Sequence, residues 1–303
     1  MNKIKQEEHL NIIEMYNNWI PVKEIAKKYN VSPKPIYKIL RDNKIEIRKC
    51  TDRQNKTDYI TNKKYTFNGD YFEIINSSEK AYWLGFLFAD GCVSLRYNNN
   101  TGNIKSGVIK IELKREDDYH LRNFVRCLNG DITVKHKTSK CNNKVFETAR
   151  LDIYSTKMCN DLIKLGCIPN KSLILEPPKN VPEEFYHAFI KGYFDGDGCI
   201  GYYPKSKSNK IYLGICGTEK FLIWIMNDLL KYNINSMKIS KDKRNNVYTL
   251  NIFGRSNMCN FYNYIYNKSS YVLGRKRDLF MKAMIDLNQN ANISKIADIA
   301  DKM

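Results

Sequence analysis

The chain of 303 residues can form one large domain or two to three smaller ones, and 43% hydrophobic residues suffice for a packed core. Its formal net charge of +18 predicts a polyanionic partner, most often a nucleic acid. The sequence contains no apolar run of membrane-spanning length, and its charged first residues are unlike a signal peptide. Nine cysteines without any CxxC pair argue against a disulfide framework or a zinc site. We therefore expect a soluble, intracellular protein of a reducing compartment, with no membrane partner.

The first 48 residues have the pattern of a small all-α helix-turn-helix domain. A first helix is predicted over residues 6–17, with Leu10, Ile13, Met15 and Tyr16 as its apolar face. A second helix is expected over residues 22–29. Ser32 and Pro33 suit the start of a third helix, which runs to about Asp42 and buries Ile36, Ile39 and Leu40. The phrase IAKKYNVSPKPIYKIL resembles the resolvase-like members of the helix-turn-helix class.

The exposed face of this third helix carries side chains suited to phosphates and base edges in a major groove. Its candidate DNA-binding residues are Lys34, Tyr37, Lys38 and Arg41. A small three-helix module that binds another protein is the alternative interpretation. The next stretch, residues 49–76, is polar and poorly periodic, and we interpret it as a linker with local structure around residues 65–75.

An internal repeat dominates the rest of the chain. WLGFLFADGCV at residues 83–93 corresponds to IKGYFDGDGCI at residues 190–200, with Gly, Asp, Gly and Cys shared at one offset of 107. A Met-Cys-Asn triplet recurs at an offset of 100, and each copy has an alternating strand followed by an amphipathic helix. The repeat predicts two α+β half-domains of one design, over residues 77–178 and 179–288. A short terminal helix is expected over residues 289–303.

Asp90 and Asp197 are the candidate catalytic residues, because each ends an apolar helix of the repeat. A glycine in mid-helix, at 85 or 192, is disfavoured by about 1 kcal/mol unless two backbones must approach closely. Two such helices packed together would bring both carboxylates side by side, where they repel each other. Divalent cations, Mg²⁺ or Mn²⁺, would relieve that repulsion and could activate water at a phosphodiester. The alternative is a helix stopped by glycine, with Asp as a turn residue.

WLGFLFADG and IKGYFDGDG resemble the two LAGLIDADG motifs of monomeric homing endonucleases, over residues 77–288. The resemblance implies two pseudo-symmetric half-domains whose saddle-shaped antiparallel sheets lie in the DNA major groove. It further implies that the last acid of each motif, Asp90 or Asp197, binds metal and cuts one strand across the minor groove. Gly91 and Gly198 would contribute to metal binding through their backbone only. The fusion of a helix-turn-helix to this domain also resembles known members of the family.

The chain departs from the LAGLIDADG pattern at two places. The earlier acidic position of the motif is Phe88 in the first copy and Asp195 in the second. The resemblance also implies a basic residue near the end of the first long strand, which Lys114 supplies in the first half. The second half has no base there, so Thr218 with a water, Lys220, or unequal rates for the two strands remain open.

Lysines with interleaved Tyr and Asn on the strands and hairpins indicate a DNA-facing sheet. The candidate DNA contacts of the strands and hairpins are Lys110, Lys135, Lys137, Lys205, Lys207, Lys210, Lys238, Lys241, Lys243 and Arg244. Any one of them could instead be a solvated edge lysine that prevents aggregation.

The sequence thus predicts a site-specific endonuclease for double-stranded DNA, of the kind associated with intron or intein mobility. Two motif copies in one chain imply a monomer without an obligate protein partner. A transcriptional regulator that binds DNA without cutting it is one alternative on this fold. A maturase that binds the RNA of a host intron is another, and its aromatic side chains would stack on unpaired bases.

Overall fold

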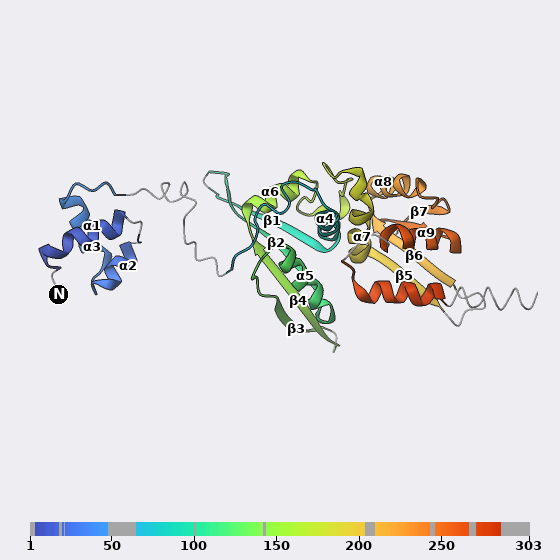
Figure 1. Ribbon diagram of the computed structural model, residues 1–303, viewed down its shortest axis with the longest axis horizontal. Coiled ribbons are helices and arrows are strands. Elements are labelled where there is room, and N and C mark those ends of the chain that lie inside the picture. Colours follow the sequence, from blue (N-terminus) through green and yellow to red (C-terminus); the bar gives the residue numbers. More distant parts are fainter. Residues whose placement is uncertain are drawn as a thin grey trace, which may run out of the picture. The chain divides into compact units, whose positions relative to one another are not determined.

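The computed structural model describes residues 4–17, 20, 22–47, 65–99, 101–141, 144–203, 210–242, 246–266 and 271–285. It divides into two compact units, Met1–Lys64 and Tyr65–Met303, which are described separately (Figure 1). The terminal helix expected over residues 289–303 lies outside the described residues. Among the described residues, no helix has both the length and the apolar character needed to cross a membrane.

The first unit contains the three expected helices. They are α1 (His9–Asn17), preceded by the 3-10 turn η1 (Gln6–Glu8), α2 (Val22–Lys28) and α3 (Pro33–Asp42). Ile36, Ile39 and Leu40 of α3 are buried, as predicted. Leu10 was wrongly assigned to the core, because its residue is 77% exposed. Tyr16 is buried as predicted, and Ile12, one helical turn earlier, completes the buried stripe of α1.

The second unit consists of two half-domains with the same order of elements. The first half contains α4 (Ser78–Asp90), β1 (Gly91–Tyr97), β2 (Ile104–Lys114), η3 (Arg115–Asp117), α5 (Asp118–Cys127), β3 (Lys135–Cys141), β4 (Lys144–Tyr154), α6 (Thr156–Lys164) and η4 (Lys171–Leu173). The second half contains η5 (Glu183–Phe185), α7 (Tyr186–Asp197), β5 (Gly198–Tyr203), β6 (Lys210–Gly217), α8 (Glu219–Leu230), β7 (Met237–Lys241), β8 (Tyr248–Ile252) and α9 (Arg255–Tyr266). Residues 274–285 form a further helix.

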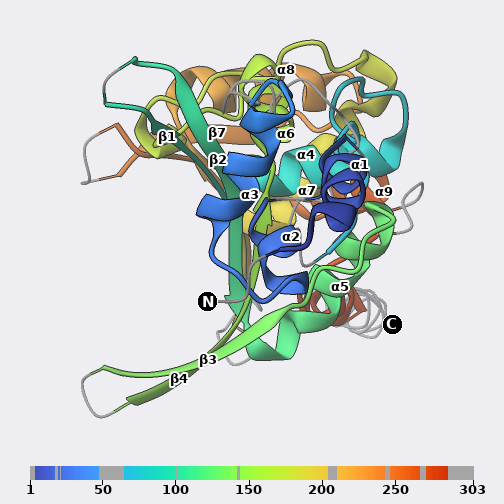
Figure 2. The same ribbon diagram turned by 90° about the vertical axis from the view of Figure 1, so that its left-hand side faces the viewer.

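Each half-domain has one antiparallel four-stranded sheet, in the order β1-β2-β4-β3 or β5-β6-β8-β7. Alternate side chains of the central strands, such as Ile109 and Ile111 of β2 or Leu213 and Ile215 of β6, are buried in one core. The β3–β4 hairpin projects from the first sheet (Figure 2). These observations confirm the predicted α+β class with two pseudo-symmetric antiparallel sheets.

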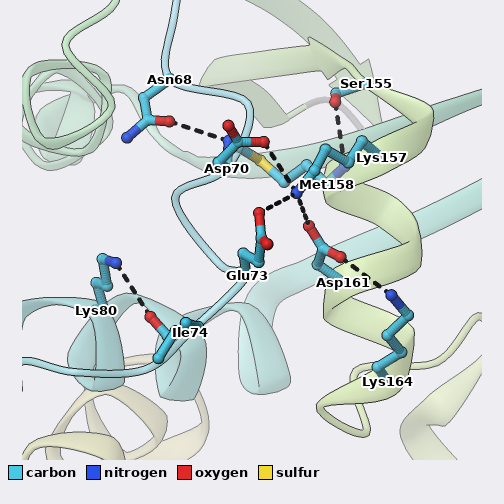
Figure 3. Close-up of polar contacts among 10 residues, drawn as sticks. All are labelled: Asn68, Asp70, Glu73, Ile74, Lys80, Ser155, Lys157, Met158, Asp161 and Lys164. Atoms are coloured by element: carbon cyan, nitrogen blue, oxygen red, sulfur yellow. Dashed lines mark hydrogen bonds and ion pairs between the residues drawn. The ribbon is translucent and has the colours of Figure 1, made fainter.

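Residues 65–76 belong to the first half-domain and not to a linker, which corrects the expected boundary at residue 76. Tyr71, Phe72 and Ile75 are buried in the core of the second unit. The Nζ atom of Lys157 on α6 lies 2.9 Å from Asp70 and 2.8 Å from Glu73, and also 2.8 Å from Asp161 (Figure 3). Hydrophobic burial and an ion-pair network together attach this stretch to α6.

The two motif helices α4 and α7 pack against each other at their glycines. A Cβ atom on Gly85 would lie 2.0 Å from the carbonyl oxygen of Phe189. A Cβ atom on Gly192 would lie 1.9 Å from the carbonyl oxygen of Tyr82. Both contacts are with backbone, which cannot rotate away, so these positions accept only glycine at this helix separation. The expected role of the mid-helix glycines is therefore seen directly in the packing.

Replacing Gly85 with Ala should lower the free energy of unfolding of the second unit by about 3 kcal/mol, because the added methyl group forces the helices apart. Urea unfolding followed by near-ultraviolet circular dichroism would measure the change. Gly69→Ala is the matched control, since no atom lies within 4 Å of its added Cβ. Equal stability of the Gly85 variant and the control would contradict the close packing.

Candidate active site

The site lies where α4 and α7 end side by side. Asp90 is the last residue of α4 and Asp197 the last residue of α7, and a strand begins at the next residue in each case. Gly91 has φ −79° and Gly198 has φ −77°, so neither adopts the left-handed conformation of a helix-stopping glycine. A Cβ atom on Gly91 would instead lie 2.6 Å from the carbonyl oxygen of Leu87. Steric room at a sharp helix-to-strand turn, and not a left-handed backbone, explains these glycines.

The two acids influence each other. Both side chains are accessible to solvent, yet the surrounding protein removes part of their hydration. This desolvation, together with the charge of Asp197, raises the pKa of Asp90 to about 6. Desolvation also raises the pKa of Asp197. The two motif helices are also close to each other beside the acids, because a Cβ atom on Gly196 of α7 would lie 3.3 Å from Oδ2 of Asp90 on α4. The carboxylates thus lie at the junction of the two half-domains, as predicted.

Two buried lysines hold the ends of the motif helices. Lys276 donates hydrogen bonds to the carbonyl oxygens of Phe194 (2.9 Å), Gly196 (2.8 Å) and Gly198 (2.6 Å). Lys171 donates to the carbonyl oxygen of Gly91. The Phe194 carbonyl also accepts the N–H of Gly198, the C-cap residue of α7. A cation at these carbonyls, at and just beyond the helix ends, offsets the negative pole of each helix. The lysines also lower the pKa values of both acids, which desolvation raises.

Lys276 remains a cation over most of the neutral range. Burial lowers its pKa to about 8, and the nearby carboxylates of Asp195, Asp90 and Asp197 oppose that shift. Between about pH 6 and about pH 8 the site therefore combines the Asp90 carboxylate with the Lys276 ammonium group. Lys171 was not among the predicted site residues, and the basic run 274–277 that contains Lys276 indicated only a phosphate contact or a helix cap. The two lysines lie 81 and 79 residues after their motif acids, in the dissimilar stretches GCIPNKSL and YVLGRKR, so no repeated pattern marked them.

The acid pair fits a divalent cation that takes few protein ligands. Within the described part of the chain, no group of three or more His, Cys, Asp and Glu side chains could hold a metal ion. Two incompletely hydrated carboxylates remain, and Mg²⁺ commonly takes one or two of these with water and phosphate as its other ligands. The carbonyls of Gly91 and Gly198 each accept a lysine hydrogen bond beside the acids.

The predicted bases at the strand ends have other partners. Lys114 ends β2, and its Nζ lies 3.6 Å from Glu116, with both side chains exposed. Thr218 is the N-cap of α8; its hydroxyl accepts from the Phe221 N–H and donates to a backbone carbonyl. Lys220 lies 2.6 Å from Glu176. None of these contacts involves Asp90 or Asp197, and the basic groups that lower the pKa of Asp90 are Lys276, Lys171 and Arg275.

The open faces of the sheets carry part of the predicted basic set. In the first sheet, Lys110, Lys135 and Lys137 lie on the face opposite the buried residues, as the strand register requires. This face also contains acids: Asp152 lies 3.4 Å from Lys135 and 2.8 Å from Arg150. The face is therefore polar with a basic excess, and its lysines are partly engaged.

In the second sheet, Lys238 is opposite Asn251 on the open face. The prediction that Lys241 lies on the DNA-facing side of the sheet was wrong. Lys241 pairs with Tyr248 and lies on the same side of the sheet as Met237 and Ile239. Its Nζ lies 5.9 Å from the centre of the Tyr248 ring. The predicted contacts at Lys205, Lys207, Lys243 and Arg244 lie outside the described residues, as does the side chain of Lys210. In the first unit, Lys34, Lys38 and Arg41 are exposed and Tyr37 is half-buried.

A buried polar cluster adjoins the site in the second half only. The carboxylate of Asp195 accepts hydrogen bonds from the Tyr82 hydroxyl (2.7 Å) and the Leu273 N–H (3.0 Å). Lys191, one turn earlier on α7, places its Nζ 5.4 Å from the centre of the Tyr82 ring. Burial raises the pKa of Asp195 to about 6 and lowers that of Lys191 to about 8. The first half has Leu84 and Phe88 at these positions, so the halves differ behind the acids.

Comparison with known families separates the chain into recognisable parts. Residues 184–266 match the family described as LAGLIDADG-like domain, and residues 2–43 match the helix-turn-helix domain of resolvase. The second half-domain is therefore similar to LAGLIDADG-like domains. The first half-domain repeats its motif and its sheet order. The resemblance inferred from the sequence is thereby confirmed for this domain and for the helix-turn-helix.

Two of the solved structures that the chain resembles are meganucleases. I-SmaMI bound to uncleaveable DNA with a TTCT central four is 16% identical, with 73% of this chain and 97% of that chain covered and a TM-score of 0.48. The LAGLIDADG meganuclease I-AabMI bound to uncleaved DNA is 16% identical, with 73% and 98% covered and a TM-score of 0.44.

Two curated relatives from Methanocaldococcus jannaschii match over part of their length. A probable translation initiation factor IF-2 is 28% identical over 202 residues, which is 60% of this chain and 14% of that protein. The DNA-directed RNA polymerase subunit Rpo1C is 23% identical over 242 residues, or 76% and 25% of the two chains. The chain thus spans no more than a quarter of the length of these two relatives.

Replacing Lys276 with Met should raise the pKa of Asp90 above its value of about 6, because the ammonium group lowers it. Carboxyl carbon shifts of Asp90, followed by NMR as a function of pH without metal, would measure this. Lys282→Met is the control, since Lys282 is an exposed lysine of the same 274–285 helix. An unchanged Asp90 titration in the Lys276 variant, with the fold intact by circular dichroism, would rule out this electrostatic coupling.

Proposed function

We propose that the chain is a site-specific endonuclease for double-stranded DNA, with one catalytic acid in each LAGLIDADG half-domain. The observation that carries the proposal is the meeting of Asp90 and Asp197 across a pseudo-two-fold seam, with a buried lysine at each helix end. Two related acids about such an axis suit the two antiparallel strands of a duplex. The resolvase-type helix-turn-helix and the net charge of +18 support DNA as the polyanion.

Asp90 and Asp197 would hold the metal, with the Gly91 and Gly198 carbonyls available beside them. A divalent cation bound there, Mg²⁺ or Mn²⁺, supplies an activated water and neutralises charge on the scissile phosphate. Lys171 and Lys276 keep the helix ends in place and supply fixed positive charge where a phosphate would approach. Deprotonated carboxylates are needed to bind the cation, so a pKa of about 6 at Asp90 predicts weaker metal binding below that pH.

Recognition would be divided between the two units. Lys110, Lys135, Lys137 and Lys238 on the open sheet faces would contact phosphates and base edges of the central target. Lys34, Tyr37, Lys38 and Arg41 on α3 would contact flanking DNA and lengthen the site. Partial matches to two proteins of different activity support a module carried between genes, as intron or intein mobility requires. The protein would act in the cytoplasm or an organelle, without an obligate partner.

Asp90→Asn and Asp197→Asn should each convert double-strand cleavage into nicking of one strand, with at least a hundredfold slower cutting of the other. The measurement is cleavage of a deep-sequenced library of random duplexes in Mg²⁺, with Ca²⁺ run in parallel. Strand-resolved products show which acid serves which strand. The control is Asp161→Asn, a buried acid of α6 that pairs with Lys157.

The same library separates the alternatives. Tight, specific binding by the wild-type chain without cleavage in any divalent metal would contradict the endonuclease and favour a regulator. Preference for intron RNA over every duplex would favour a maturase.

Triple replacement of Lys34, Lys38 and Arg41 with Ala should weaken target binding at least tenfold and lower the salt dependence by about three phosphate contacts. Cleavage at saturating protein should persist, because the acids lie in the other unit. Fluorescence anisotropy at several salt concentrations would measure both effects. Lys164→Ala with Lys231→Ala removes exposed charge from outside the helix-turn-helix as a control. Lost cleavage at saturation with an intact fold would contradict this division of roles.

A further inference from the structure

Each site lysine belongs to a short segment that follows the third helix of its half-domain. The first lysine segment comprises residues 171–176 after α6, and the second comprises residues 271–276 after α9. Lys171 contacts the end of the first motif helix, and Lys276 contacts the end of the second. Each lysine thus contacts the motif of its own half.

The second lysine segment is held by the first half-domain. The backbone N–H of Gly274 donates to the hydroxyl of Tyr119 at 2.8 Å. The guanidinium of Arg275 donates to the buried carboxylate of Asp117, also at 2.8 Å. Near the start of the segment, the hydroxyl of Tyr271 donates to Glu79 of α4 at 2.9 Å. Three contacts within five residues therefore come from the opposite half.

The first lysine segment is held by the second half-domain in the same manner. The hydroxyl of Thr218 donates to the carbonyl oxygen of Leu175. The Nζ atom of Lys220 lies 2.6 Å from Oε1 of Glu176. The side-chain amide of Asn246 donates to the carbonyl oxygen of Leu173. Again the contacts of the lysine segment come from the other copy of the repeat.

The anchoring residues occupy equivalent positions in the two copies. Asp117 is the N-cap residue of α5 and Thr218 is the N-cap residue of α8. Tyr119 and Lys220 each follow two residues later, on the first turn of these helices. The four side chains have different chemistry, yet both copies use these two positions to hold the lysine segment of the other copy. The arrangement therefore follows from the two-fold packing and not from one favourable contact.

We propose that each half-domain positions the site lysine of the other: Asp117 and Tyr119 position Lys276, and Thr218 and Lys220 position Lys171. These four are positioning residues, since they act through the lysine segments and not on the reacting atoms. The role in cleavage rests on the proposed endonuclease function, whereas the positioning itself does not. It follows that neither half-domain can place its own lysine without the other.

Tyr119→Phe and Lys220→Ala test the proposal with the full chain. Both side chains are substantially exposed, so the fold should persist. Brief acetylation of the metal-free, DNA-free protein, read by mass spectrometry, reports the accessibility of each site lysine. Lys220→Ala should raise labelling of Lys171 about two- to fivefold and leave Lys276 unchanged, as expected for the loss of one exposed contact. Tyr119→Phe should raise labelling of Lys276 and leave Lys171 unchanged.

Matched controls remove similar contacts elsewhere. Lys231→Ala breaks an ion pair of equal length, 2.6 Å to Glu183, in the same half as Lys220. Arg122→Ala breaks a 2.9 Å pair with Asp118 beside Tyr119. Neither should change the labelling of Lys171 or Lys276. The charge exchange Lys220→Glu with Glu176→Lys should restore wild-type labelling of Lys171. Equal labelling changes at both lysines in each variant, or none, would overturn the proposal.

Strand-resolved nicking supplies a second readout. Tyr119→Phe and Lys220→Ala should shift the preferred strand in opposite directions, with the strands assigned by the Asp90→Asn and Asp197→Asn variants. Selective labelling in a chain that cuts no DNA would support reciprocal positioning and count against the endonuclease. Normal strand-specific cleavage with unselective labelling would support the endonuclease and count against reciprocal positioning.

Discussion

Direct contact between the backbones of α4 and α7 is the constraint on which the site depends. Carbonyl oxygens of Phe189 and Tyr82 occupy the space that a Cβ atom of Gly85 or Gly192 would need. Each helix then continues to a terminal aspartate, so the separation of the carboxylates is fixed by backbone packing and not by flexible side chains. A mid-helix glycine disfavours each helix by about 1 kcal/mol. The extensive aromatic core around the seam, including Trp83, offsets that penalty.

This packing creates an electrostatic conflict that the remaining elements reduce. Two carboxylates and two negative helix poles meet where hydration is incomplete. The pKa of Asp90 is raised as a consequence. Lys171 and Lys276 oppose the shift while bonded to carbonyls at and just beyond the helix ends. The compensation is partial, because Asp90 still titrates near pH 6. A site that still favours added positive charge at neutral pH is suited to a divalent cation and to the phosphate it would accompany.

The sequence allowed prediction of the features that the repeat preserves, namely the glycines of the seam, both acids and the order of elements. It did not reveal the role of Lys171 and Lys276 at the ends of the motif helices, because their segments share neither sequence nor backbone: one is a 3-10 turn, and the other enters the 274–285 helix. Thr218 was considered for catalysis because a helix N-cap and a catalytic hydroxyl look alike without coordinates. The side of the sheet occupied by Lys241 depended on strand register, which the short β7 pattern did not determine.

The halves are alike in plan but are not interchangeable, and the buried cluster at Asp195 explains why. Its carboxylate accepts a hydrogen bond from the Tyr82 hydroxyl of the other half. The residue of the second half equivalent to Tyr82 is Phe189, which has no hydroxyl. Two copies of the second half paired together would leave each buried Asp195 without this donor, beside a buried Lys191, at a penalty of about 1–3 kcal/mol per lost partner. The cluster therefore favours pairing between the two unlike halves of one chain.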